Sequence, residues 1–122
     1  MRSNCSDESS RAVNSSRPLA VDMRETTIDN NCLRNAFWDG RNLAVDLICI
    51  PRNSEIFLDV EAANDQFVYC ERGTCCAIIT NVNGGTTLQC QVCPNTAVFV
   101  PADSRCELST NNCPCQLFTI SA

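Results

Sequence analysis

The chain has 122 residues, which is enough for one domain with its own hydrophobic core. Its 14 acidic residues outnumber its 9 basic ones, and the net charge of −5 repels polyanions, so nucleic acids and anionic membrane surfaces are excluded as partners. No apolar run is long enough to span a bilayer, and the polar N-terminal stretch lacks the apolar core of a secretory signal, so we expect a cytoplasmic protein.

The elements of the chain begin with a polar tail. Residues 1–17 are rich in Ser and Asn, and a helix over residues 6–14 remains open there, whereas residues 18–122 are predicted to form the folded domain. From residue 42 onward, short segments rich in Val, Ile, Thr and Phe predict strands. They cover residues 42–51, 55–61, 66–71, 75–82, 86–92, 96–101, 105–109 and 115–121.

Turn signals between these segments support an all-β fold. The sequence "NVNGG" at residues 81–85 predicts a tight hairpin, because Asn and Gly accept the positive φ that such turns require. With no convincing amphipathic helix, about eight strands at this spacing predict a sandwich or a small barrel. Alternation with period two places neighbours such as Leu117 and Phe118 on opposite faces. The candidate core residues are Val45, Leu47, Phe57, Val68, Ile78, Val98, Val100, Leu117 and Phe118.

Eleven cysteines and no histidine make the composition unusual. Because no secretory signal is found, we expect most of these cysteines to be reduced thiols that are buried or half-exposed, not a disulfide framework. The pairs Cys90/Cys93 and Cys113/Cys115 have short spacings that a four-thiolate zinc site could use. Strand residues three apart face opposite sides, however, so this zinc site is disfavoured.

Six stretches in this order resemble the cupins, which are small jelly-roll β-barrels. The stretches are "LRNAFWDG", "VDLICIP", "SEIFLDVE", "DQFVYCERG", "AVFVPADSRCEL" and "PCQLFTI". The resemblance covers most of the chain and is strongest to compact single-domain cupins. It implies an all-β jelly-roll barrel, also called a double-stranded β-helix, and a homodimer.

The resemblance also places the cupin ligand positions in this sequence. The two histidines of the first cupin motif fall on Asp59 and Glu61, the acid of that motif falls on Gln66, and the histidine of the second motif falls on Cys106. The resemblance implies that these four side chains line a ligand pocket at the barrel mouth. Two carboxylates, an amide and a thiol form an unusual set in place of imidazoles, so we predict no tightly bound metal, although zinc, iron or manganese stays open.

Other motif positions also hold substituted residues. Three glycines of the family are replaced by Asn53, Asn95 and Asp103, and the asparagine of the second motif is replaced by Thr110. Asn and Asp are the residues that, after Gly, best tolerate left-handed backbone conformations. The turns are therefore predicted to persist without their glycines.

Without a metal, the acids at the barrel mouth need another role. Arg52, Arg72 or Arg105 could pair with them, or a buried Glu61 with a raised pKa could act as a general acid or base. The sequence leaves open that both acids are simply solvated. Cys106 could be a redox-sensitive thiol, whereas a Cys–His nucleophile is excluded because the chain has no histidine.

Three functions follow from these alternatives, and whether the chain is an enzyme stays open. The preferred hypothesis is a non-catalytic, degenerate cupin barrel that binds a small molecule or serves as a homodimeric module. The second is a metal-dependent oxygenase or isomerase that uses Asp59, Glu61, Gln66 and Cys106 as ligands. The third is a thiol-rich metal or redox protein. The fold alone does not decide between them, because one barrel supports many chemistries.

Overall fold

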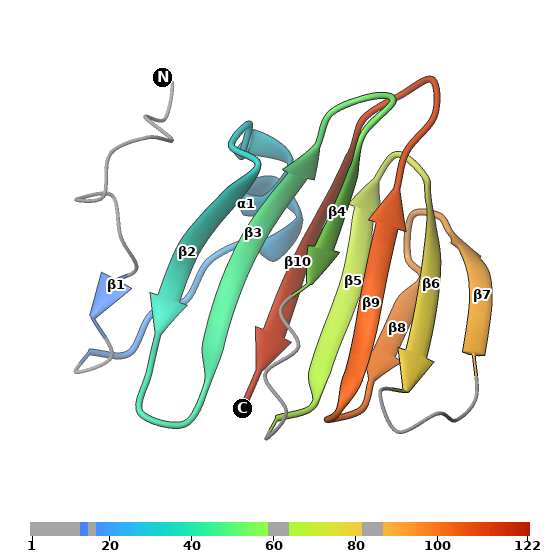
Figure 1. The fold of residues 1–122 in the computed structure, drawn as a ribbon. Coiled ribbons are helices and arrows are strands. Elements are labelled where there is room, and N and C mark those ends of the chain that lie inside the picture. The colour runs from blue at the N-terminus through green and yellow to red at the C-terminus, as the bar shows by residue number, and fades with distance from the viewer. Residues whose placement is uncertain (1–12, 15–16, 59–63, 82–86) are drawn as a thin grey trace.

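The structure is a computed structural model of the chain, and it describes residues 13–14, 17–58, 64–81 and 87–122. These residues form two β-sheets and one short helix (Figure 1). Sheet A contains, in spatial order, β1 (Val13–Asn14), β2 (Arg34–Asp39), β3 (Ala44–Ile50), β10 (Cys115–Ser121), β5 (Gln66–Arg72) and β8 (Ala97–Val100). Sheet B contains β4 (Glu55–Leu58), β9 (Ser104–Ser109), β6 (Cys75–Asn81) and β7 (Thr87–Val92).

The chain passes between the two sheets in the order of a jelly roll. From β3 onward, β3, β5, β8 and β10 lie in sheet A, and β4, β6, β7 and β9 lie in sheet B. Strands β3 to β10 pair antiparallel with their neighbours, whereas β1 pairs with β2 in parallel. The predicted all-β jelly-roll barrel is confirmed, and a strand of the structure overlaps each of the predicted strand segments.

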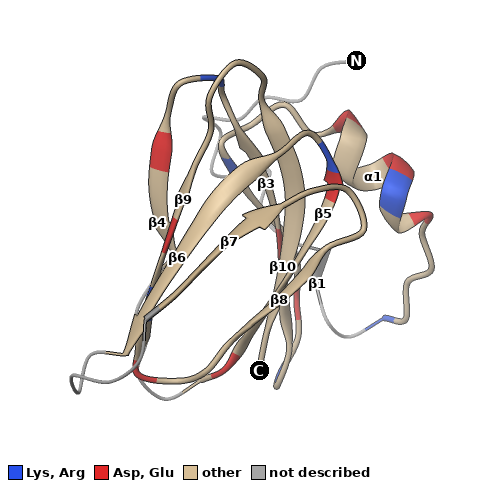
Figure 2. Ribbon diagram, turned by 90° about the vertical axis from the view of Figure 1, so that its right-hand side faces the viewer, with Lys and Arg blue, Asp and Glu red and all other residues tan. Residues whose placement is uncertain are grey.

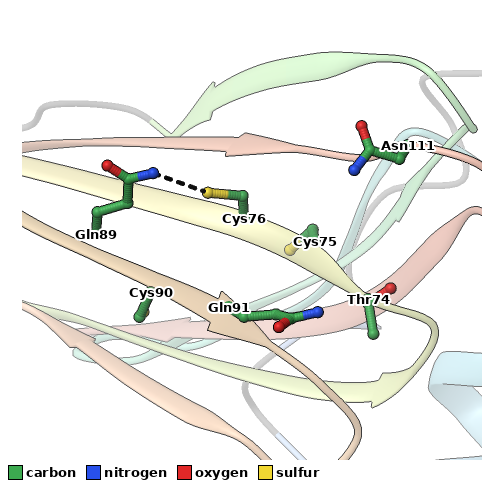
Figure 3. A pocket seen from close by; sticks show the side chains of 7 residues that line it. All are labelled: Thr74, Cys75, Cys76, Gln89, Cys90, Gln91 and Asn111. Atoms are coloured by element: carbon green, nitrogen blue, oxygen red, sulfur yellow. Dashed lines mark hydrogen bonds between the residues drawn. The ribbon is translucent and has the colours of Figure 1, made fainter.

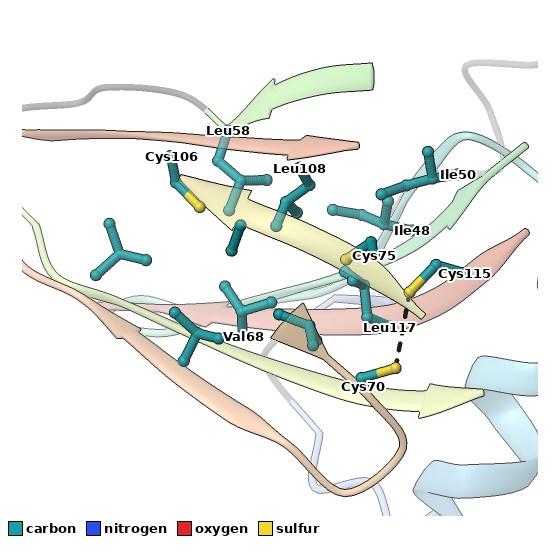
Figure 4. Close-up of a cluster of buried hydrophobic side chains, with 14 of the residues drawn as sticks. Ile48, Ile50, Leu58, Val68, Cys70, Cys75, Cys106, Leu108, Cys115 and Leu117 are labelled. Atoms are coloured by element: carbon teal, nitrogen blue, oxygen red, sulfur yellow. Dashed lines mark hydrogen bonds between the residues drawn. The ribbon is translucent and has the colours of Figure 1, made fainter. Parts of the chain in front are cut away.

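The hydrophobic core lies between the inner faces of the two sheets (Figure 4). Alternation selects its members: in β5 the side chains of Val68 and Cys70 point inward, and in β6 those of Cys75, Ala77 and Ile79 do so. Buried thiols pack here as small apolar groups beside the aliphatic side chains. The whole cluster consists of Ile48, Ile50, Leu58, Val68, Cys70, Cys75, Ala77, Ile79, Val92, Val98, Val100, Cys106, Leu108, Cys115 and Leu117.

Most of the predicted core residues are buried, but the prediction was wrong for some of them. The buried ones are Leu47, Val68, Val98, Val100, Leu117 and Phe118. Phe57 is 51% exposed, because Ile56 and Leu58 occupy the inward positions of β4. Ile78 and Val45 are only half-buried, and both lie on the outer faces of their strands, although Leu47 on the same face of β3 is buried. These strands carry apolar residues on both faces, so alternation alone does not identify the inner one.

The structure contains a helix that the sequence did not predict. Helix α1 (Met23–Asp29) begins at Asp22, whose side chain accepts a hydrogen bond from the backbone nitrogen of Glu25 at 3.0 Å. Asp followed three residues later by Glu is a known signal for the start of a helix, and Asp22 and Glu25 carry this signal in the sequence. Gln116 in β10 fixes the helix by donating to the carbonyl of Ile28 at 2.6 Å. Nowhere in the described ranges does a helix have the length and apolar character needed to cross a bilayer.

Two further strands, β1 and β2, were also not among the predicted elements. Val13 and Asn14, at the end of the segment where a helix remained open, form β1 and pair with β2. The rest of that segment lies outside the described residues. The predicted "NVNGG" hairpin mostly lies outside them as well, although its flanking strands β6 and β7 pair antiparallel as a hairpin requires.

The substituted turns adopt the predicted backbone conformation. Asn53, Asn95 and Asp103 have positive φ values of 54°, 73° and 65°, so the prediction that these turns persist without glycine is confirmed. Thr110 stabilises the turn between β3 and β4, because its hydroxyl donates to the carbonyl of Pro51 and accepts from the backbone nitrogen of Ser54 at 3.1 Å. These turns are therefore kept without the glycines that the cupin resemblance implies.

Candidate functional site

The predicted ligand pocket is only partly within the described residues. Asp59 and Glu61 lie outside them, so the structure does not test whether they converge with the other two predicted side chains. Gln66 begins β5, where it pairs with Val100 of β8 and, by alternation, shares the inward face with Val68. Cys106 lies in β9 on the inward face of sheet B. The two described members thus come from opposite sheets and both face the barrel interior.

Cys106 is held as a neutral thiol by its surroundings. It is 1% exposed and lies in the ladder between Leu58 of β4 and Ile79 of β6. Desolvation by burial, with smaller effects of the nearby Cys75 and Cys90 thiols, raises the pKa of Cys106 to about 12. Because metals bind the thiolate, a metal at this position would first have to displace the thiol proton.

The other thiols also form no metal site among the described residues. No group of three or more Cys, Asp or Glu side chains in the described ranges is arranged to hold a metal ion. This includes the disfavoured zinc site of Cys90, Cys93, Cys113 and Cys115, in which Cys115 is buried and Cys113 is exposed. Cys32 is disulfide-bonded, and nine other cysteines of the described residues are free.

A small cavity lies beside Gln66. It has a volume of about 210 Å³ and is lined by Asp65, Gln66, Phe99, Val100 and Pro101. Asp65 shapes its rim by accepting a hydrogen bond from the backbone nitrogen of Ala102 at 2.8 Å. The cavity is smaller than the pockets of roughly 300–1,000 Å³ that usually hold drug-sized ligands.

A larger groove, which sequence reasoning missed, lies along β6 and β7 of sheet B (Figure 3). Its volume is about 580 Å³, and we call it the β6–β7 groove. Gln89 and Gln91 are two residues apart in β7 and share its outer face, opposite Ile78 and Cys76 of β6. The amide of Gln89 donates toward the sulfur of Cys76 at 3.9 Å. The lining residues are Thr74, Cys75, Cys76, Gln89, Cys90, Gln91 and Asn111.

The chemistry of this groove is polar and uncharged. Its polar groups are carboxamides, a hydroxyl and thiols, and its lining includes no Asp, Glu, Lys or Arg. Burial raises the pKa of Cys90, with smaller contributions from the thiols of Cys76 and Cys75, so this thiol stays neutral as well. Such a lining both donates and accepts hydrogen bonds without attracting ions.

A group of aromatic rings covers part of the outer face of sheet A. The ring centroids of Phe67 and Phe99 are 5.1 Å apart, and those of Tyr69 and Phe118 are 5.4 Å apart. Phe99 is nevertheless 71% exposed. Strands β8 and β10, which contribute two of the rings, carry no charged residue (Figure 2). We call Phe67, Tyr69, Phe99 and Phe118 the aromatic face.

Comparison with known proteins supports the fold but names no activity for this chain. No family model matches the sequence. The uncharacterized protein YrkC of Bacillus subtilis (strain 168) is 28% identical over 107 residues, which cover 87% of this chain and 58% of YrkC. The chain therefore spans less than two thirds of that relative.

Solved structures show a similar barrel. The structure of BH2720 from Bacillus halodurans has a TM-score of 0.80 and 27% identity, covering 88% of this chain and 82% of BH2720. KdgF from Halomonas sp., a cupin-type protein, has a TM-score of 0.61 and 11% identity, covering 72% of this chain and 74% of KdgF. At that identity KdgF supports the cupin-like fold alone.

Proposed function

We propose that the chain is a degenerate single-domain cupin that binds an uncharged small molecule, forms a homodimer and lacks metal-dependent catalysis. The β6–β7 groove carries this proposal. Its volume of about 580 Å³ lies in the range of small-molecule pockets, and its lining offers hydrogen-bonding groups without charge. This chemistry favours a ligand that carries hydroxyl or amide groups and no net charge.

Three carboxamide side chains determine which hydrogen-bonding groups such a ligand must carry. Gln89, Gln91 and Asn111 each present both donors and an acceptor, and the hydroxyl of Thr74 adds one more of each kind. A carboxylate or phosphate would find no cation among these groups to offset the loss of its hydration. A sugar, polyol or simple amide would exchange its hydrogen bonds to water for equivalent ones to the groove.

Ligand-observed NMR with uncharged sugars, polyols and amides tests this part of the proposal. Binding should weaken at least tenfold in the Gln89→Ala/Gln91→Ala double variant and persist in Gln66→Ala, which changes the smaller cavity. The opposite pattern would move the ligand to the pocket that the family resemblance implies. Binding of carboxylates in preference to uncharged compounds would contradict the proposed ligand class.

The absence of metal catalysis is supported by the state of Cys106. A neutral, buried thiol lies at the position of a cupin histidine, and removing its proton is costly in an apolar cluster. Elemental analysis of protein purified without chelator, repeated on Glu61→Ala and Cys106→Ser, tests this. Near-stoichiometric zinc, iron or manganese that disappears in both variants would favour the enzyme hypothesis, and more than one metal per chain would favour the thiol-rich metal hypothesis.

The homodimer is supported by the aromatic face. A second copy is the occupant that suits it, because the four rings carry no charge, although Glu71 lies on the same face of β5 and each chain has a net charge of −5. Phe99, 71% exposed and on the edge strand β8, would supply the most accessible ring of such an interface, and aromatic side chains often contribute most to binding.

A further inference from the structure

Two buried thiols from distant parts of the sequence are in contact inside the barrel (Figure 4). The sulfurs of Cys70 in β5 and Cys115 in β10 are 3.7 Å apart, and both residues are 0% exposed. Neither belongs to the β6–β7 groove or to the family ligand positions. The contact is therefore not explained by the function proposed above.

The local backbone is built to bring these thiols together. β5 and β10 are neighbours in sheet A, and a register shift between Gln116 and Leu117 interrupts the regular ladder beside Cys115. Just after β5, Gly73 has a φ of 86°, and a Cβ on it would lie 2.0 Å from the carbonyl oxygen of Pro114. Only a glycine allows this close approach, which places the start of β10 against the end of β5.

We propose that Cys70 and Cys115 form a reversible disulfide that cross-links β5 to β10, with hydrogen peroxide as the oxidant. The thiolate of Cys70 attacks one peroxide oxygen, giving a sulfenic acid and, after proton transfer, water. The sulfur of Cys115 then attacks the sulfur of Cys70, its proton is lost, and the hydroxyl leaves as a second water. Two thiols and one peroxide thus yield one disulfide and two waters.

A disulfide is about 2.05 Å long, so the two sulfurs must approach each other by roughly 1.7 Å. Cys70 is paired with Leu117 in the ladder, so Cys115 lies diagonally across from it, and the bond requires a shift of the first residues of β10 in addition to side-chain rotation. Cys70 is suited to be the first nucleophile, because a hydrogen bond from Cys115 is the main effect that lowers the pKa of its thiol, against the opposing effect of burial.

A cavity that a small oxidant can enter lies next to the segments that carry the pair. Arg72, Gly73, Cys113 and Pro114, the chain neighbours of the two thiols, line an open cavity of about 480 Å³. Hydrogen peroxide is hardly larger than water, so local opening of the turn after β5 would admit it. Cys75 is the competing partner, because it also hydrogen-bonds the thiol of Cys115.

Peptide mapping of the full chain tests the proposal. Protein treated with hydrogen peroxide and then denatured in N-ethylmaleimide should lose two hydrogens and yield a cross-linked peptide that joins Cys70 to Cys115. Cleavage with trypsin and Glu-C places Cys70 and Cys75 in different peptides, because Glu71 and Arg72 lie between them. It also separates Cys106 from the peptide that contains Cys113 and Cys115, because cleavage occurs after Glu107. Fragmentation of the peptide distinguishes Cys113 from Cys115.

Variants and stability provide the controls. The cross-link should be absent from Cys70→Ala, remain in Cys76→Ala, and disappear from the parent after treatment with dithiothreitol. Oxidation should raise the melting midpoint of the parent and of Cys76→Ala but not of Cys70→Ala, since a cross-link between distant residues restricts the unfolded chain. A Cys75–Cys115 link, or recovery of both Cys70 and Cys115 as free thiols from the parent, would overturn the proposal even if the variants fail to fold.

Discussion

The two faces of sheet A differ in how evenly they bury apolar side chains. On the inner face, Val68 and Leu117 are 0% exposed and pack against sheet B. On the outer face, burial falls toward the edge of the sheet, because Phe118 in β10 is 8% exposed whereas Phe99 in the edge strand β8 is 71% exposed. A strand that is apolar on both faces is typical of a sheet covered on both sides. We expect the inner face to determine stability, and the exposed part of the outer face is where we propose that a second copy binds.

The largest loss of folding stability is expected when a buried side chain on the inner face of sheet A is truncated. Leu117→Ala should lower the free energy of unfolding by about 2–5 kcal/mol, because it removes a fully buried side chain and leaves a cavity. Phe99→Ala on the outer face of the same sheet is the matched control and should cost the monomer less than about 1 kcal/mol. Urea denaturation at a protein concentration low enough for the parent and both variants to be monomeric measures both losses. Equal losses would contradict the division of roles between the faces.

A smaller loss is expected where the ends of β5 and β10 approach each other. Gly73→Ala should lower the free energy of unfolding by about 3 kcal/mol, because a Cβ at a φ of 86° is strained and would meet the carbonyl oxygen of Pro114 at 2.0 Å. Asn53→Gly, at a φ of 54°, is the control, since glycine adopts that conformation freely and the change should stay within about 1 kcal/mol. A tolerated Gly73→Ala would mean that the two strand ends can separate without cost.

The strands and these turns could be predicted because their signals are local. Each strand has its own alternation and its own flanking turn residues, and positive φ at Asn53, Asn95 and Asp103 follows from what those side chains tolerate. Helix α1 was missed because seven residues carry little periodicity, so that only the cap at Asp22 marked it.

The site could not be predicted in the same way. Gln89 and Asn111 line one groove only because β6 lies between β7 and β9 in sheet B. No local sequence pattern predicts that strand order. Cys70 and Cys115 are 45 residues apart and meet only through strand order. The exposure of Phe57 likewise depends on which face of β4 meets sheet A, and the sequence is apolar on both. Whether Asp59 and Glu61 converge with Gln66 and Cys106 stays a prediction.

The buried thiols of the inner face should make stability depend on alkaline pH. The thiol of Cys106 has a pKa raised from 9.0 to about 12 by burial. Between these values the unfolded chain releases the proton and the folded chain keeps it, so the contribution is complete below pH 9 and is lost as the pH rises toward 12. Each pH unit in this window should cost about 1.4 kcal/mol, or about 2 kcal/mol at pH 10.5.

Urea denaturation at pH 7, 9 and 10.5 measures this dependence. In Cys106→Ala, the free energy of unfolding should fall less between pH 7 and pH 10.5 than it does in the parent. Cys76→Ala removes a half-exposed thiol on the outer face of β6 and should leave the fall of the free energy of unfolding with pH unchanged. Identical slopes for the parent and both variants would show that the Cys106 thiol is not protected from ionisation in the folded state.

The smallest effect on stability, and the largest on assembly, is expected at the outer face. Phe99→Asp should change the free energy of unfolding of the monomer by less than about 0.5 kcal/mol, because the ring is mostly in contact with water. It should nevertheless convert the proposed dimer into a monomer, because two copies of a new carboxylate would be buried together without partners at the interface. Light scattering across micromolar concentrations measures the mass.

Phe57→Asp is the matched control for assembly. Phe57 is a similarly exposed phenylalanine, at 51%, but it lies on the outer face of sheet B, away from the aromatic face. Because the change in charge and in apolar area is the same, the Phe57→Asp variant should remain a dimer if the aromatic face is the interface. A parent that is monomeric at all concentrations would remove the dimer from the proposal, and a dimer that survives Phe99→Asp but not Phe57→Asp would move the interface to sheet B.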